Sequence, residues 1–234
     1  MDTLCTLMNS VVVAASEADC QSASDKFING YLCLLRSLAT LAAAFPAVPA
    51  YAASRLQHFA ASPAHRSKDP ATGCPDLGEL LVLRLLGGEA ALPWGGGFGE
   101  AFVEEAMVRN VRWFLRDHPE LRLEGKAKGA SGGQQAVAGS RGPLTFRATA
   151  VSRRVVSFQC LFAQLCQGLD LGGFVDGDCP PALLGQLKGA YAAVAAQADW
   201  AAYRTLLGLR PLPEKELEAA IVANIQSSKS RGYH

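Results

Sequence analysis

Residue types that could carry out chemistry are sparse in this chain. Four histidines occur among 234 residues, and one of them is the last residue. No HExxH motif or zinc-ligand spacing connects His58, His65, Cys74 and His118. A Cys74–His58 pair stays open as nucleophile and base, because such partners need only meet in space. The sequence predicts no metal site and no cofactor, and it assigns no catalytic residue.

A glycine-rich segment, PWGGGFG at residues 93–99, precedes a predicted helix. Exposed N–H groups at the start of a helix can bind phosphate. The segment lacks the Lys-Ser/Thr pair of a P-loop and a convincing preceding strand. These features favour a hinge, and an enzyme site near residues 93–99 is kept as an alternative.

The strongest candidate for a binding surface is a stripe of arginines in EEAMVRNVRWFLRDHPEL. Arg109, Arg112 and Arg116 recur at i, i+3 and i+7, next to Trp113. Glu105 lies one turn before Arg109, which predicts an exposed ion pair. Because arginine and tryptophan are enriched at interface hot spots, these four residues are predicted to bind a protein partner with an acidic surface. A solvated helix face with one packed tryptophan is the alternative.

Two charges interrupt the apolar segment LGELLVLRLL, namely Glu79 and Arg84. Buried charges require partners, so both are predicted to be structural charges with separate partners. Glu79 could close a capping box with Asp76, and Arg84 could meet Glu104 or Glu105. The segment is predicted to be a buried helix, with a buried parallel strand as the alternative.

Apolar residues recur at steps of three and four, and no useful period-two alternation occurs. The predicted fold is therefore all-α, an irregular bundle of about seven or eight helices with one long disordered loop. The predicted helices cover residues 22–45, 50–61, 77–86, 100–118, 143–169, 181–198, 200–208 and 213–227. Residues 1–20 are predicted to be a weakly ordered arm, and 21–234 a single domain. The low-complexity, glycine-rich stretch at 124–142 is the predicted loop.

Composition narrows the class of protein. Hydrophobic residues make up 50% and charged residues 18% of the chain, which excludes wholesale disorder. A formal net charge of +1 predicts no nucleic-acid partner and no attraction to an anionic membrane. Residues 36–54 have a signal-like pattern but lie behind a helical pattern, and Arg36 with two prolines argues against a membrane span. Seven cysteines without CxxC spacing favour a reducing compartment, so we expect a soluble, cytoplasmic protein without membrane partners.

The leading functional hypothesis is a helical protein-interaction or scaffolding module, either complete or part of a larger protein. One alternative is an enzyme of a family that the sequence does not identify, with its site near the glycine hinge at residues 93–99. The other is a binder of an apolar small molecule in the bundle core, where helical folds often place such sites. Whether the chain is an enzyme stays open at this point.

Overall fold

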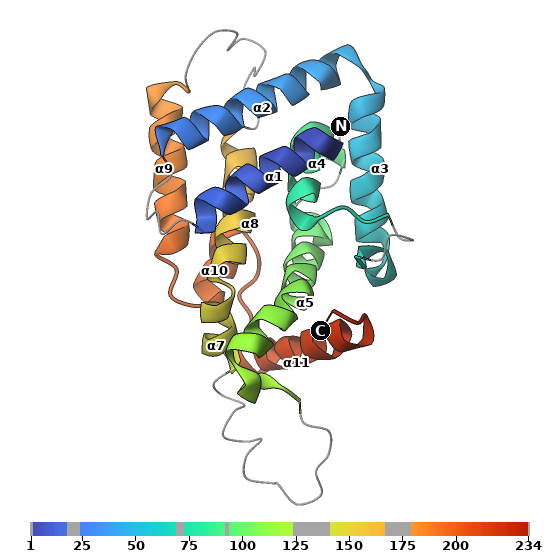
Figure 1. Cartoon of the computed structure of the whole chain (residues 1–234), viewed down its shortest axis with the longest axis vertical. Helices are drawn as coiled ribbons and strands as arrows, with labels where there is room; N and C mark the ends of the chain where they lie inside the picture. Colours follow the sequence, from blue (N-terminus) through green and yellow to red (C-terminus); the bar gives the residue numbers. More distant parts are fainter. Residues whose placement is uncertain are drawn as a thin grey trace, which may run out of the picture. The chain divides into compact units, whose positions relative to one another are not determined.

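The computed structural model describes residues 2–17, 24–68, 73–91, 94–123, 141–166 and 179–233. Within these ranges every regular element is helical, and ten are α-helices, which confirms the all-α prediction (Figure 1). The chain divides into two compact units. Unit 1 comprises Met1–Phe98 and Arg153–Ala196, and unit 2 comprises Gly99–Ser152 and Gln197–His234. The single domain expected from the sequence stays a prediction.

Unit 1 contains four consecutive helices and two later ones. These are α1 (Asp2–Glu17), α2 (Asp25–Ala44), α3 (Ala47–Ala61), α4 (Leu77–Ala91), most of α8 (Ala150–Cys166) and α9 (Pro181–Ala195). A short 3-10 turn at Pro63–Arg66 follows α3, and a π-helical turn at Trp94–Phe98 ends the first stretch. The start of α2 has a local cause, because the Ser24 hydroxyl accepts the Phe27 N–H at 3.2 Å.

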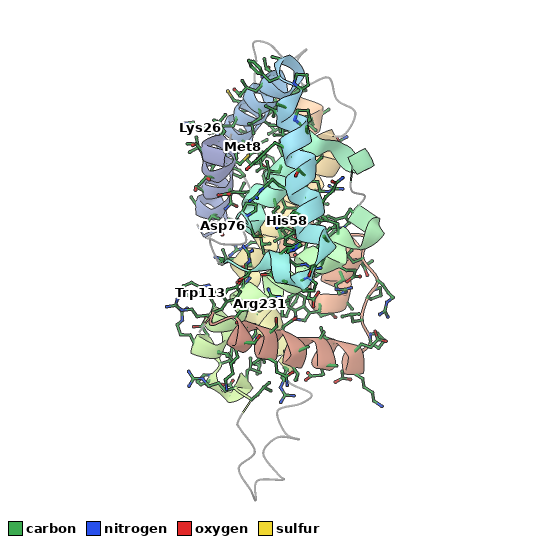
Figure 2. The ribbon with its side chains drawn as sticks, turned by 90° about the vertical axis from the view of Figure 1, so that its right-hand side faces the viewer. Met8, Lys26, His58, Asp76, Trp113 and Arg231 are labelled. Carbon is green, nitrogen blue, oxygen red and sulfur yellow. The ribbon has the colours of Figure 1, made fainter. Side chains whose placement is uncertain are left out.

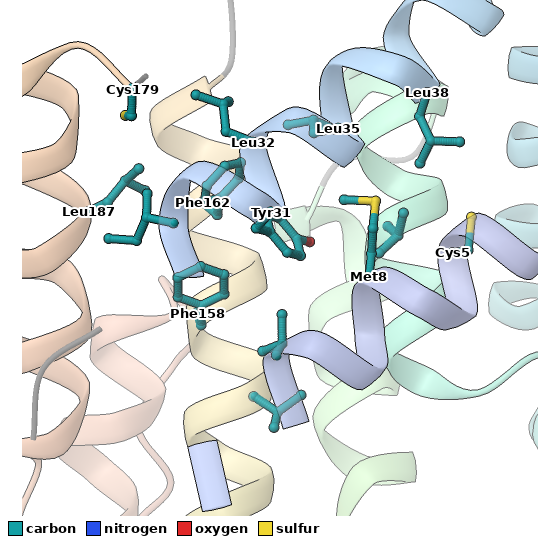
Figure 3. Close-up of a cluster of buried hydrophobic side chains, with 14 of the residues drawn as sticks. Cys5, Met8, Tyr31, Leu32, Leu35, Leu38, Phe158, Phe162, Cys179 and Leu187 are labelled. Carbon is teal, nitrogen blue, oxygen red and sulfur yellow. The ribbon is translucent and has the colours of Figure 1, made fainter. Parts of the chain in front are cut away.

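The core of unit 1 is built around aromatic side chains from α2 and α8 (Figure 3). The Tyr31 ring meets Phe158 edge-on at 5.4 Å and Phe162 at 4.7 Å between ring centroids. Leucines from α2 and α9 surround these rings, and Met8 from α1 packs on the same cluster. Face-to-edge ring packing adds to the free energy of burial, so this cluster fixes how the helices of unit 1 pack.

Helix α1 differs from the weakly ordered arm that the sequence predicts for residues 1–20. Cys5, Met8 and Val12 are fully buried at i, i+3 and i+7. Threonine, asparagine and serine between them weaken the apolar pattern, and no capping motif marks a start. Residues 18–20 lie outside the described part of the chain.

Unit 2 contains α5 (Gly99–Asp117), a 3-10 turn at Pro119–Leu121, α7 (Arg141–Ala148), α10 (Trp200–Leu206) and α11 (Glu214–Ser230). Its core joins Phe102, Val111 and Phe114 of α5 with buried isoleucines of α11. The Trp200 indole N–H donates to the Gly142 carbonyl at 3.1 Å, linking α10 to α7. The Asp199 carboxylate accepts the Ala202 N–H at 2.8 Å, which confirms the predicted start of α10.

The long helix predicted for residues 143–169 is divided in the structure. Helix α7 ends at Ala148, α8 begins at Ala150, and Thr149 lies between them. The buried hydroxyls of Thr145 and Thr149 each donate to a carbonyl four residues earlier, both at 2.8 Å. Such side-chain bonds bend helices. This division and α1 raise the helix count from eight to ten. The predicted loop at 124–142 falls outside the described residues up to 140, whereas Arg141 and Gly142 begin α7.

A basic groove as candidate functional site

Three of the four predicted partner-binding residues are exposed on the C-terminal half of α5. Arg112 and Arg116 are exposed, and Trp113, which is labelled in Figure 2, is 48% exposed. The two guanidinium carbons lie 5.7 Å and 5.0 Å from the centroid of the Trp113 ring, within the range of cation–π attraction. The Arg116 Nε donates to Asp117 Oδ1 at 2.7 Å, which raises the pKa of Arg116 and lowers that of Asp117.

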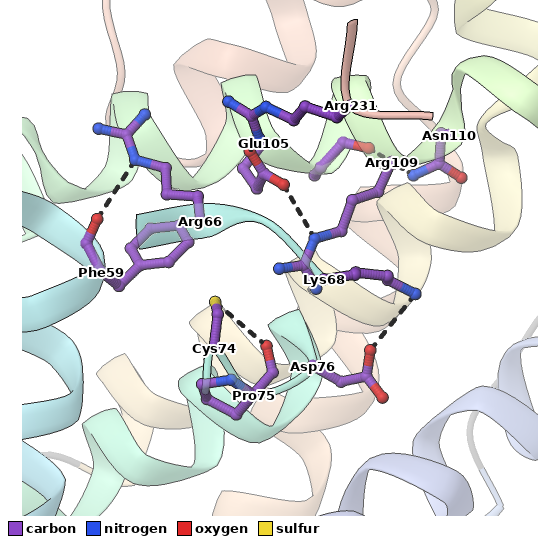
Figure 4. A network of polar contacts seen from close by, with 11 residues as sticks. Phe59, Arg66, Lys68, Cys74, Pro75, Asp76, Glu105, Arg109, Asn110 and Arg231 are labelled. Atoms are coloured by element: carbon purple, nitrogen blue, oxygen red, sulfur yellow. Dashed lines mark hydrogen bonds and ion pairs between the residues drawn. The ribbon is translucent and has the colours of Figure 1, made fainter. Parts of the chain in front are cut away.

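Arg109 does not belong to this exposed surface. Its side chain is 7% exposed, and its Nε donates to Glu105 Oε1 at 3.0 Å. Glu105 is 1% exposed, so the ion pair predicted to be exposed is buried. The reason lies in α11: Arg231, directly after that helix, donates to Glu105 Oε2 at 2.6 Å, so the end of α11 packs against this part of α5 (Figure 4).

The exposed arginines border a groove of about 820 Å³, here called the basic groove. Its walls come from α5, the segment after the 3-10 turn, and α11. Among the lining residues that the structure describes, four are cationic and none is acidic. The lining residues are Arg112, Trp113, Leu115, Arg116, Arg122, Leu123, Ile225, Gln226 and Lys229. Positive charge therefore gathers beside an apolar wall.

Two local structures position the walls of the basic groove. Glu105 holds α5 to the end of α11 through Oε2, which accepts from Arg231, while its Oε1 accepts from Arg109 on α5 itself. After α5 the chain folds back, because Leu121 N–H donates to the His118 carbonyl at 3.0 Å and Arg122 N–H to the Pro119 carbonyl at 3.1 Å. Leu121 is buried and anchors this turn. Burial lowers the pKa of Arg231, but the hydrogen bond and charge of Glu105 raise it, with a net increase.

Helix geometry accounts for two of the four cations. Arg116 lies in the last turn of α5 and Lys229 in the last turn of α11, where a positive charge favours the helix dipole. Arg112 is a full turn earlier, and Arg122 follows the 3-10 turn, so the dipole does not explain them. Sequence spacing found Arg112 and Arg116, but Arg122 and Lys229 join them only through the fold, since nothing in their spacing connects them to α5.

The two predicted structural charges lie in unit 1. Glu79 is half-buried, and its Oε1 accepts the Thr6 hydroxyl at 2.7 Å, which links α4 to α1. Arg84 is buried, with its guanidinium carbon 5.4 Å from the centroid of the Trp94 ring. Desolvation lowers the pKa of Arg84, and the nearby Cys160 opposes this shift. Glu105, one of the acids expected to meet Arg84, has its two oxygens engaged by Arg109 and Arg231.

The other sequence candidates show no assembled chemistry. In the described residues, no three His, Cys, Asp or Glu side chains could hold a metal ion. The rings of His58 and His65 are stacked at 4.1 Å, and the Cys74 thiol donates to the Pro75 carbonyl at 3.5 Å. The glycine hinge forms the π-helical turn, whose two side chains with described burial are Trp94 and Phe98, both buried.

Comparison with known proteins adds no functional assignment. No protein-family model, curated protein or solved structure matches this chain. A helical fold alone does not define an activity, so the residues of the site carry the functional information.

Proposed function

We propose that this protein is a helical interaction module whose basic groove binds an acidic peptide segment of a partner protein. The observation that supports this proposal is the described part of the groove lining, which has four cationic residues, an exposed tryptophan and no acid. A surface of one charge sign beside apolar walls attracts ligands of the opposite sign and holds their apolar side chains.

The lining also favours a particular kind of peptide. Arg112, Arg116 and Arg122 can each hold a carboxylate with two parallel hydrogen bonds. Leu123, which is half-buried, offers apolar contact in the same groove as Trp113. A segment in which acidic and large apolar residues alternate would use both kinds of wall.

The test uses a fluorescein-labelled peptide of alternating glutamate and leucine, and a second peptide with glutamine in place of glutamate. Fluorescence anisotropy should show that the glutamate peptide binds more tightly than the glutamine peptide. The affinity of the glutamate peptide should fall steeply as salt is added. The double variant Arg112→Gln/Arg116→Gln should weaken binding by about tenfold or more.

The matched control removes the same charge elsewhere in unit 2. Arg147 and Lys215 are exposed and do not line the basic groove. The variant Arg147→Gln/Lys215→Gln should bind like the parent. Equal weakening by both double variants, or equal affinity for the two peptides, would show that the groove is not the binding site.

The two alternative functions have less support. At the glycine hinge, Trp94, Phe98 and the glycines carry no acid, base or nucleophile, so no reaction can be assigned to them. In unit 1, the described aromatic rings of the core contact one another directly, so they give no support for an apolar ligand between them. The interaction module is therefore the better-supported function.

A further inference from the structure

The arginines of unit 2 fall into two groups that differ in their counter-charges. Five of the six that lie outside the basic groove hold a carboxylate within 3.3 Å, and two of these five share Glu105 (Figure 4). The acids come from α5 and α11, the same helices that form walls of the groove. The five paired arginines are Arg109, Arg141, Arg204, Arg210 and Arg231.

The cations of the basic groove lack such counter-charges. Within the part of the chain that the structure describes, Arg112, Arg122 and Lys229 make no ion pair. Arg116 bonds the adjacent Asp117 through its Nε, and its two terminal nitrogens bond no described residue. All four cationic side chains are exposed. Because like charges in one groove repel one another, a concentrated negative charge supplied from outside would relieve that repulsion.

Two of these cations are already held in place by an aromatic ring. The guanidinium carbons of Arg112 and Arg116 lie 5.7 Å and 5.0 Å from the centroid of the Trp113 ring. A guanidinium that stacks on a ring keeps its N–H groups available at its edge for a ligand. A side chain that is already restrained also loses less entropy when a ligand binds. An anionic group beside Trp113 would therefore meet two preoriented donors.

We infer that the basic groove holds a phosphoryl group, carried by a phosphorylated serine of the acidic peptide; this inference rests on the function proposed above. A phosphate monoester carries about two negative charges and three acceptor oxygens at pH 7. A glutamate carries a single charge on two oxygens. The phosphate can therefore engage more than one arginine fork at once, and Lys229 adds a point charge.

The form of the site favours a peptide over a membrane or a nucleic acid. The four cations line a hollow of about 820 Å³, which is the size of a pocket for a compact ligand. The formal net charge of +1 gives little long-range attraction to a polyanion or to a charged bilayer. A short segment with its charge concentrated on one residue matches both observations.

The experiment compares three fluorescein-labelled peptides of alternating glutamate and leucine, which differ only at the central acidic position. That position holds phosphoserine, one glutamate, or two glutamates that match the charge of the phosphate. In fluorescence anisotropy with the full chain, the phosphoserine peptide should bind about tenfold more tightly than either other peptide. Phosphorus NMR should show a shift of the phosphoserine resonance on binding.

Single variants locate the phosphate. Arg112→Gln should reduce the preference for phosphoserine over one glutamate to about twofold or less, and Arg122→Gln should act in the same direction. Both residues are exposed, so neither change should disturb the fold. Arg147→Gln is the matched control, because Arg147 is exposed in unit 2 and does not line the groove, and it should keep the full preference.

The outcomes separate this inference from the proposed function. Equal binding of the phosphoserine and two-glutamate peptides, or an unchanged preference in both groove variants, would overturn the inference. The proposed function would survive that result if Arg112→Gln/Arg116→Gln still weakened the glutamate peptide. Absence of binding by every peptide would remove both. Displacement of the phosphopeptide by vesicles of phosphatidylcholine and phosphatidic acid would point to a lipid headgroup and overturn the peptide as the source.

Discussion

Among single residues, Glu105 has the greatest influence on the candidate site. It is a fully buried carboxylate that receives one guanidinium on each oxygen, from Arg109 and from Arg231. Desolvation of three charges is costly, and good geometry offsets that cost only while all three are present. Glu105 therefore stabilises the wall of the basic groove without lining it.

Glu105→Gln should lower the free energy of unfolding by about 3–5 kcal/mol, because two arginines lose their shared counter-charge. Chemical denaturation followed by circular dichroism measures this change. Glu104→Gln is the matched control, since Glu104 is adjacent on α5 and exposed, and it should cost about 1 kcal/mol or less. Equal effects of the two substitutions would contradict the role assigned to Glu105.

Cysteine reactivity gives a second test at this scale. Burial raises the pKa of the Cys160 thiol to about 12, so at pH 8 about one molecule in ten thousand carries the reactive thiolate. Cys33 is exposed. Iodoacetamide should therefore alkylate Cys33 and spare Cys160 between pH 7 and 9, and both should react in guanidinium. Mass spectrometry that locates the modified cysteines measures the rate of alkylation at each position. Alkylation of Cys160 in the folded protein at the same rate as Cys33 would refute its burial.

At the level of elements, α1 and α4 approach closely at a glycine. Gly78 is buried, and a Cβ added there would overlap the Asn9 side chain. Asn9 Oδ1 also accepts the Gln159 amide N–H at 3.3 Å, which restricts its freedom to move away. The pair explains why a glycine stands in the first turn of an otherwise good helix.

Gly78→Ala should destabilise the protein by about 1–3 kcal/mol, although alanine favours a helix over glycine. Asn9→Ala removes the overlapping atoms at the cost of the Gln159 hydrogen bond. In a double-mutant cycle, the double variant should lose less stability than the sum of the single variants. Simple additivity, or a stabilising Gly78→Ala, would show that the helices are not in this close contact.

The elements also show how far the sequence was informative. Helix α2 has a strong apolar period and a serine cap, and α5 has a clear core face, so both were predicted close to their observed positions. Helix α1 was missed because polar residues separate its three buried side chains. The break at Thr149 was missed because hydroxyl bonds to the backbone leave no trace in apolar spacing.

Only part of the candidate site was predicted, because helical spacing reports one face of one helix and not the packing of other segments against it. Helical spacing placed Arg112, Trp113 and Arg116 on one surface, and the structure agrees on their exposure. Spacing could not show that the end of α11 covers Arg109, nor that Arg122 and Lys229 line the same groove. Arg122 is placed by the local turn after α5, whereas Arg231 and Lys229 reach α5 through packing between segments over a hundred residues apart.

At the scale of the whole molecule, charge is nearly balanced although one surface is strongly basic. The formal net charge is +1, yet four cations line one groove, and the described lining residues include no acid. A balanced chain gives little long-range attraction to polyanions, so the field of the groove acts only within about 10 Å at 0.1 M salt. This local field is measurable without a partner, because one tryptophan lies inside it.

The three tryptophans of the chain make that measurement possible. Trp94 in unit 1 and Trp200 in unit 2 are buried, whereas Trp113 is 48% exposed between two arginines. Iodide should quench part of the fluorescence, caesium should quench much less, and Trp113→Phe should remove the difference. Because arginines concentrate the anion near the ring, Arg112→Gln/Arg116→Gln should also reduce iodide quenching, and added salt should do the same. Equal quenching by the two ions at low salt would mean that Trp113 is not surrounded by positive charge, and the basic groove would lose its main physical support.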